Sequence, residues 1–303
     1  MDILVLGGAG QVGTELQAHP WPEGVRVHAP TRDALDITDP AAVAAALAER
    51  AYAAVINTAA YTAVDKAEAD VTAAWRLNAL APALLAEQTR ARGIPLVHVS
   101  TDYVFAGTKP EGAYAPDEPV DPRSVYGASK AAGEFAVRTG NPRHAILRTA
   151  WVVSPHRGNF VKTMLRLAGE RDALTVVDDQ HGCPTSAADL AAALATVALR
   201  MARDPDAPTG TFHCVNAGST TWRGFAEAIV AGGARRGGRT VPVTGIPTSA
   251  YPTPARRPAN SRLSTDSLTA AYGVVPRPWQ AALADILDRL VGPVHTGTHG
   301  DPR

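Results

Sequence analysis

A tyrosine and a lysine one helical turn apart are the residues of this chain whose types and spacing most directly indicate chemistry. Tyr126 and Lys130 stand in PRSVYGASKAAGE (122–134), where a predicted helix places both side chains on one face. The chain has only four lysines beside twenty-five arginines, and roughly one chain in ten of this composition would contain such a pair by accident. An ammonium group lowers the pKa of a neighbouring phenol, whose usual pKa is about 10. We therefore predict that Tyr126 is an acid–base catalyst and that Lys130 tunes it.

A hydroxyl group at the end of a predicted strand completes this set. The segment IPLVHVSTDYVFAG (94–107) begins as a buried strand, and Ser100 and Thr101 fall where that strand ends. A hydroxyl there can hydrogen-bond a substrate carbonyl and hold it beside the tyrosine, and we assign this role to Thr101. We interpret Ser100 as bonded to the backbone, and His98 and Asp102 as structural residues that flank the two hydroxyls.

The glycine-rich segment GGAGQVG (7–13) offers a place for a dinucleotide. It follows the first predicted strand and opens a helix, a context in which glycines let backbone N–H groups approach a pyrophosphate. Arg32 follows the second strand, which favours NADPH because an arginine can meet a 2′-phosphate; NADH is the alternative. Lys130 is also expected to bond the nicotinamide ribose. The predicted cofactor residues are Gly7, Gly10, Gln11, Val12, Arg32, Asp36, Ile37, Ala59, Ala60, Tyr61, Asn78, Tyr126 and Lys130.

A parallel sheet is needed to bring these groups together. Five runs are nearly continuous in apolar residues, as is typical of strands buried on both faces: 2–6, 25–29, 53–57, 94–100 and 144–149. Helical patterns alternate with them at 40–50, 71–92 and 124–139. This alternation predicts an α/β fold with a Rossmann-type doubly wound parallel sheet, whose carboxyl edge carries the cofactor.

The second half of the chain has a less regular pattern. Strands are predicted at 174–178 and 211–215, helices at 158–170, 186–202, 221–232, 264–272 and 278–291, and a loop over a binding face at 242–262. We predict two units and a tail: a cofactor domain of residues 1–150 plus 186–215, a smaller α/β substrate-binding domain of residues 151–185 plus 216–291, and a disordered segment at 292–303.

Composition argues against several classes of partner. Twenty-nine basic residues balance twenty-nine acidic ones without a basic stripe, so no nucleic-acid partner is expected. No run approaches the ~20 apolar residues of a membrane span, and MDILVLGGAG (1–10) lacks the basic start of a signal peptide. Cys183 and Cys214 cannot form a disulfide framework, and Cys183 is interpreted as a buried small hydrophobe. We predict a cytoplasmic protein without a membrane partner.

Several longer stretches match one family in order and spacing, from residue 1 to about residue 290. They are GGAGQVGTEL, NTAAYTAVDKAE, STDYVFAG, VYGASKAAGE, RTAWVV, GNFVKTMLRLA, VVDDQHGCPT and TSAYPTPARRPANSRLST. Through them the sequence resembles the dTDP-4-dehydrorhamnose reductases of the extended short-chain dehydrogenase/reductase family.

The resemblance implies an activity and a set of substrate contacts. The activity is NAD(P)H-dependent reduction of the 4-keto group of dTDP-4-dehydro-L-rhamnose to dTDP-L-rhamnose, with Tyr126 protonating the carbonyl oxygen. An indole offers a stacking surface for sugar or thymine, although core packing is the other interpretation of Trp151. Arginines suit a diphosphate, and Arg262 joins two others in ARRPANSR, although a solvated loop is equally consistent. The implied substrate positions are Asp102, Tyr103, Trp151, Asn159, Arg256 and Arg257.

The sequence departs from the family at a metal site. Some members dimerise around a magnesium ion held by acids, and Glu15 matches the first of these. The later acid falls near Ala188, where only Asp189 is adjacent. We therefore expect no metal, with Glu15 as the single candidate ligand, and a monomer or homodimer that binds a dTDP-sugar.

Two other functions are consistent with the same motifs. A related dTDP-4-keto-6-deoxysugar reductase that makes an antibiotic sugar in secondary metabolism is the main alternative. A non-catalytic regulatory homologue is disfavoured because Thr101, Tyr126 and Lys130 are all present. A dehydratase on this fold is expected to carry an Asp-Glu pair after the threonine, where this chain has Asp102-Tyr103.

Overall fold

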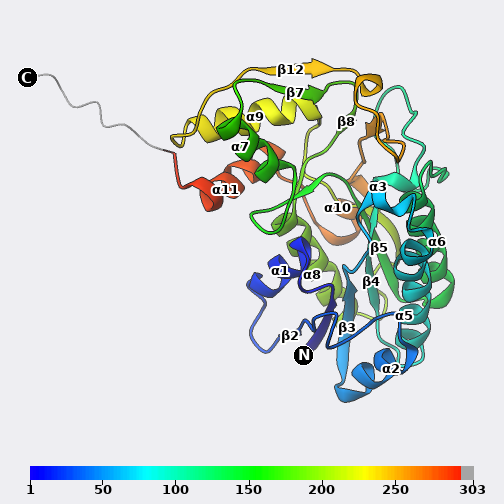
Figure 1. Ribbon diagram of the computed structural model, residues 1–303. Helices are drawn as coiled ribbons and strands as arrows, with labels where there is room; N and C mark the ends of the chain where they lie inside the picture. Colours follow the sequence, from blue (N-terminus) through cyan, green and yellow to red (C-terminus); the bar gives the residue numbers. More distant parts are fainter. Residues whose placement is uncertain (295–303) are drawn as a thin grey trace, which may run out of the picture.

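A parallel sheet of six strands lies at the centre of residues 1–294, the part of the chain that the computed structural model describes (Figure 1). The strand order is β10-β5-β4-β3-β1-β2, and all neighbouring pairs are parallel. The order reverses between β1 and β3, and in sheets of this kind the ligand crevice lies outside the carboxyl ends of the strands at that point. The predicted Rossmann-type doubly wound sheet is confirmed. Its strands are β1 (Asp2–Leu6), β2 (Arg26–His28), β3 (Tyr52–Asn57), β4 (Leu96–Thr101), β5 (His144–Thr149) and β10 (Gly210–His213).

Helices cover both faces of this sheet, which is why its strands are apolar throughout (Figure 1). Helices α1 (Gln11–Ala18) and α8 (Ala187–Arg203) bury one face, and α2 (Pro40–Glu49), α5 (Ala81–Arg90) and α6 (Val125–Gly140) bury the other. The Asp39 side chain caps α2 as its sequence predicts, and Ser124 caps α6 by accepting a hydrogen bond from the backbone N–H of Gly127. Helix α6 is thereby started just before the predicted catalytic pair.

The helix predicted over residues 71–92 is interrupted. It consists of α4 (Val71–Trp75), a π-helical turn η1 (Arg76–Leu80) and α5. Pro82 has no N–H group to donate to Asn78, which loosens the turn between them. Helix α6 crosses here so closely that a Cβ atom on Gly133 would lie 2.1 Å from the Asn78 carbonyl oxygen. The irregular turn therefore fixes Asn78 between two helices.

A second apolar core lies among the elements that follow β5. It contains Phe225, Ile229 and Leu283, and all its fully buried members fall within 151–185 and 216–291. The division into two units stays a prediction, because Leu268 from this part of the sequence packs into the core of the main sheet. The helices are α7 (Phe160–Glu170), α9 (Trp222–Ala234), α10 (Asp266–Tyr272) and α11 (Trp279–Val291), beside short single turns α3 (Val64–Ala67), η2 (Asp102–Val104) and η3 (Thr248–Ala250).

Three small sheets complete the described chain. They pair β7 (Leu174–Val177) with β12 (Val243–Ile246), β6 (Val152–Val153) with β9 (Thr185–Ser186), and β8 (His181–Gly182) with both β11 (Thr220–Thr221) and β13 (Asn260–Ser261). The expectation of a loop throughout 242–262 is therefore wrong at both ends. Each end pairs with a strand far away in the sequence, so no local pattern announces it. The predicted tail lies outside the described residues from position 295 onward.

Cys183 and Cys214 are both buried free thiols, as expected for small hydrophobic residues. Of the helices in residues 1–294, none is long and apolar enough to cross a membrane.

Candidate active site

The end of β4 and the first turn of α6 bring Thr101 and Tyr126 together. Thr101 is 5% exposed and Tyr126 9% exposed, and the Thr101 side chain lies beside the phenol, where it acts to lower the pKa of Tyr126. Tyr103 packs edge-to-face against Tyr126, with ring centroids 5.4 Å apart. A carbonyl oxygen placed at this edge would therefore meet two hydroxyl groups in a largely apolar surrounding.

Lys130 lies one turn farther along α6 and is almost completely buried. Its Nζ donates a hydrogen bond to the Val99 carbonyl oxygen (2.7 Å) and lies 3.3 Å from Nε2 of His98. Burial lowers the pKa of Lys130 to about 8, with the Glu134 carboxylate opposing the change. The amino group is thus turned toward β4.

The pKa of Tyr126 differs from the sequence-based expectation. Burial raises it above the usual value, and the neighbouring Thr101 side chain opposes this only in part. The expected lowering by Lys130 is not found, because desolvation dominates at this buried site. Tyr126 is consequently a protonated phenol near neutral pH, which suits a group that donates a proton.

Asp102 and Ser100 flank Thr101 in the sequence and behave differently. Asp102 accepts hydrogen bonds from the Thr101 hydroxyl (3.0 Å) and from the Ser261 hydroxyl, and burial raises its pKa to about 6. It therefore ties the catalytic hydroxyl to β13. The interpretation of Ser100 as backbone-bonded is wrong: its buried hydroxyl has no hydrogen-bond partner among residues 1–294.

Three arginines that the sequence could not rank lie in different surroundings. Arg257 donates to the Tyr103 hydroxyl (2.9 Å) and to the Asp65 carboxylate (2.6 Å), so it faces the catalytic edge. Arg262 donates to Asn260 (3.0 Å), and Arg256 is exposed. Arg257 is thus the arginine of this loop that contacts Tyr103, which itself packs against the catalytic Tyr126.

Trp151 and Asn159, two further predicted substrate positions, make internal contacts. The Trp151 indole stacks on Trp222 with centroids 3.6 Å apart, and Gly182 lies against it so closely that a Cβ atom would approach to 2.4 Å. Asn159 caps α7 and donates to the Gln11 side chain (3.0 Å). Their contact with substrate stays a prediction.

The glycine turn is shaped to hold a dinucleotide closely. Gly7 has a φ of +82°, and a Cβ atom on Gly13 would lie 2.2 Å from the Gly7 carbonyl oxygen. Gly10 precedes α1 without a side-chain cap, so the first N–H groups of that helix face outward for an anion. Gln11 and the buried Val12 form the first turn of the helix. These observations fit a bound pyrophosphate.

The remaining predicted cofactor residues lie in the segments that follow β2 and β3, apart from Asn78 in η1. Asp36 accepts two hydrogen bonds from Thr38, which lower its pKa, and the positive charge of Arg32 lies nearby. Asn78 holds the backbone of Tyr61 by bonds of 2.8 and 3.1 Å. The other members are the buried Ile37 and the half-buried Ala59 and Ala60.

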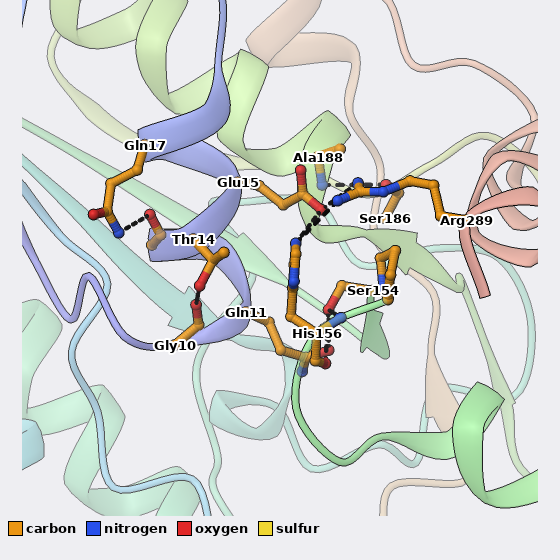
Figure 2. A network of polar contacts seen from close by, with 12 residues as sticks. Gly10, Gln11, Thr14, Glu15, Gln17, Ser154, His156, Ser186, Ala188 and Arg289 are labelled. Carbon is orange, nitrogen blue, oxygen red and sulfur yellow. Dashed lines mark hydrogen bonds and ion pairs between the residues drawn. The ribbon is translucent and has the colours of Figure 1, made fainter.

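Glu15, the candidate metal ligand, is already neutralised by side chains of the chain itself (Figure 2). Its buried carboxylate accepts a hydrogen bond from Arg289 (2.7 Å) and lies 3.0 Å from Nε2 of His156, with Ala188 beside it. A guanidinium group in this position repels a cation, so these residues do not fit a magnesium ion. In the described ranges of the chain, no three His, Cys, Asp or Glu side chains gather in a metal-binding cluster.

Several residues of the site escape detection from the sequence. Asp65 orients Arg257, Ser261 bonds Asp102, and Asn57 contacts His98 (3.1 Å). Each partner is separated from the residue it contacts by 41 positions or more. Spacing rules cover one or two helical turns and give no signal at such separations.

Comparisons with known proteins agree with this geometry. The family described as "RmlD substrate binding domain" matches residues 1–291. A dTDP-4-dehydrorhamnose reductase of Sinorhizobium fredii is 43% identical over 92% of this chain and 94% of its own length. A probable dTDP-4,6-dihydroxy-2-methyloxan-3-one 4-ketoreductase of Streptomyces antibioticus is 42% identical over 98% of both chains.

A solved structure extends the likeness to three dimensions. The dTDP-4-dehydrorhamnose reductase of Bacillus anthracis, in complex with NADP, superposes with a TM-score of 0.88 at 33% identity, over 95% of this chain and 99% of that one. Sequence identity, coverage and fold lead to the same assignment, and the chain belongs to the dTDP-4-dehydrorhamnose reductase family.

Proposed function

We propose that the protein reduces the 4-keto group of dTDP-4-dehydro-L-rhamnose and so forms dTDP-L-rhamnose. The observation that carries this proposal is that Thr101, Tyr126 and Lys130 lie at the same edge of the sheet as the glycine turn before α1. Tyr126 is protonated there, and α1 begins without a side-chain cap. Membership of the reductase family supports the substrate class.

The chain's own residues bind the substrate, orient it and deliver a proton. NADPH, when bound, supplies the hydride for the sugar carbon. Thr101 hydrogen-bonds the keto oxygen and holds it against the phenol of Tyr126. Tyr126 then gives its proton to that oxygen as negative charge develops there. Because burial keeps Tyr126 protonated, it is ready to donate at neutral pH.

The diphosphate of the nucleotide is assigned to the loop that carries Arg256 and Arg257. Arg257 is held by Asp65 and reaches the Tyr103 hydroxyl, so its guanidinium is oriented before substrate arrives. An oriented guanidinium can make two parallel hydrogen bonds to phosphate oxygens. The exposed Arg256 can supply a second charge.

The proposal also covers the cofactor preference, the compartment and the oligomeric state. Arg32 at the crevice favours NADPH over NADH through its charge toward a 2′-phosphate. NADH use is the measurable alternative. The protein acts in the cytoplasm, where both nucleotides are made, as a monomer or homodimer.

The test is NADPH oxidation by the purified protein, with dTDP-4-dehydrorhamnose generated in situ by a dehydratase and an epimerase. Oxidation that depends on the epimerase, with dTDP-rhamnose identified by mass and sugar analysis, supports the proposal. Tyr126→Phe should lower kcat by a factor of ~10² or more while binding persists. No oxidation with this substrate would refute the assignment.

A second function is favoured by one comparison. The 4-ketoreductase of Streptomyces antibioticus, whose name indicates a different sugar, is as similar to this chain as the rhamnose reductases are. The second candidate is therefore reduction of another dTDP-4-keto-6-deoxysugar. Activity on such a sugar with none on dehydrorhamnose would establish it.

A further inference from the structure

A row of hydrogen-bonded side chains lies behind the catalytic lysine. Asn57 at the end of β3, His98 in β4 and Lys130 in α6 are 0%, 0% and 2% exposed. Asn57 and His98 are directly paired across the two strands, with Nδ2 of Asn57 3.1 Å from Nδ1 of His98. On the other side of the ring, Nε2 lies 3.3 Å from Nζ of Lys130. The imidazole thus has a nitrogen contact at each end.

The backbone fixes the direction of these contacts. The N–H of Ala59 donates to Oδ1 of Asn57 (3.1 Å), so the amide oxygen faces Ala59 and the amide nitrogen faces His98. An amide nitrogen only donates hydrogen bonds. Nδ1 of His98 must therefore accept, and the single proton of the neutral ring sits on Nε2. That N–H points at Lys130.

An ammonium group is a poor neighbour for this N–H. It has three donors and no acceptor, so it would face Nε2–H without a lone pair between them. A neutral amine has a lone pair that accepts from Nε2–H while its own N–H donates to the Val99 carbonyl oxygen (2.7 Å). The contacts around Nζ are satisfied together only when Lys130 is an amine.

We propose that His98 is a positioning residue that donates a hydrogen bond to Lys130 and favours its neutral amine over the ammonium in the cofactor-free protein. The consequence for the reaction, which rests on the proposed function, is that a smaller fraction of Lys130 carries the charge that would favour ionisation of Tyr126. His98, interpreted from the sequence as merely structural, thereby acts on catalysis through Lys130.

The charged and titratable groups around the pair are consistent with this arrangement. Burial lowers the pKa of Lys130 to about 8 and that of His98 well below its usual value. A donor to Nζ stabilises only the amine and acts in the same direction as burial. Glu134 on α6 opposes it, but that carboxylate is engaged by Arg148 from β5 (2.7 Å). Tyr126, on the same helix, stays neutral because burial raises its pKa.

The small number of lysines makes a direct test feasible. The chain has only Lys66, Lys109, Lys130 and Lys162, so ¹³C-labelled lysine gives few Cε resonances, and Lys130→Arg identifies the one of interest. In the cofactor-free wild type, Lys130 should titrate about two or more pH units below the other three, whose usual pKa is about 10.4. Titration together with them would overturn the proposal.

Two variants separate hydrogen bonding from burial. His98→Gln can turn an amide oxygen toward Nζ and accept from an ammonium, so the Lys130 titration should rise by about one pH unit or more. His144→Gln is the matched control, because His144 is a buried histidine in the neighbouring strand that bonds Asn141 instead. It should leave Lys130 unchanged. A low Lys130 titration that His98→Gln does not move would show that burial alone sets it.

If His98→Gln does not fold, the wild type still decides the question. Two-bond ¹⁵N–¹H spectra of the histidine rings, with His98 assigned through the backbone of Val97 and Val99, report which nitrogen carries the proton. A proton on Nε2 supports the proposal, and a proton on Nδ1 overturns it. These measurements need no turnover, so they stand apart from the outcome of the reductase assay.

Discussion

Glu134 lies one turn beyond Lys130 on α6, and replacing it with glutamine should destabilise the protein strongly. Its carboxylate receives two hydrogen bonds from Arg148, from Nε (2.8 Å) and from Nη2 (2.7 Å), and both side chains are 1% exposed. Arg148 also donates to the Pro116 carbonyl oxygen (3.0 Å) and lies 4.9 Å from the centre of the Phe105 ring. Its guanidinium therefore has no route to water.

The size of the effect follows from this burial. Glu134→Gln keeps the shape of the side chain but leaves the Arg148 charge without a counterion, which costs about 3–5 kcal/mol. Arg138, which also contacts Glu134, is 34% exposed, so that second pair adds little. For 303 residues, at about 2.1 cal/mol/K of unfolding entropy each, the loss corresponds to a fall in Tm of roughly 5–8 °C.

Urea unfolding measures the loss as a lower midpoint at an unchanged m-value. Arg138→Gln is the surface control and should change the free energy of unfolding by less than about 0.5 kcal/mol. The double variant Glu134→Gln/Arg148→Met should recover most of the loss, because no unpaired charge stays buried. A single-variant loss below about 1 kcal/mol, or a double variant as unstable as the single one, would refute the reasoning.

Three further predictions concern other parts of the site. Burial raises the pKa of Asp102 in the folded protein to about 6 from the ordinary 3.8, so the free energy of unfolding should fall by up to about 3 kcal/mol as pH rises through that window and the proton is lost. Asp102→Asn should remove this decline in urea unfolding measured from pH 4 to 7. An unchanged decline in the variant would contradict the prediction. Gly13→Ala should abolish NADPH binding measured by fluorescence titration, because the added Cβ atom would lie 2.2 Å from the Gly7 carbonyl oxygen. Unaltered affinity for NADPH would show that the glycine turn can shift. Arg289→Met should lower the free energy of unfolding, measured by thermal unfolding, by about 1–3 kcal/mol because the buried Glu15 loses a partner. Arg289→Lys should retain most of that stability. Equal losses in both variants would exclude charge as the cause.

The sequence was sufficient for those parts of the fold and site that depend on short-range patterns. Apolar runs at 2–6 and 144–149 predict strands whose bounds the structure reproduces, because a strand covered on both faces needs continuous apolar residues. The helix at 40–50 was recognisable from its Asp39 cap and following proline. These signals are local, so they can be read without knowing which segments meet.

The predictions that failed depend on what each segment packs against. The strand β12 in the expected loop forms by pairing with β7. Neither segment by itself indicates that the two will pair. The turn η1 breaks the helix expected over 71–92 beside the close crossing of α6 at Gly133. The hydroxyl of Ser100 lacks the backbone partner expected for it because the strand geometry brings no acceptor within reach in the described chain.

By itself, the sequence determined the chemistry that is available: a phenol and an amine one helical turn apart, a glycine turn after the first strand, and the family to which the motifs belong. Only the tertiary structure decided how these groups behave. Burial turns Tyr126 into a protonated acid, β4 places His98 against Lys130, and Arg289 neutralises Glu15. The physical reason is that desolvation and hydrogen-bond direction depend on neighbours that are distant in the chain, and those neighbours exist only once the sheet and its helices are packed.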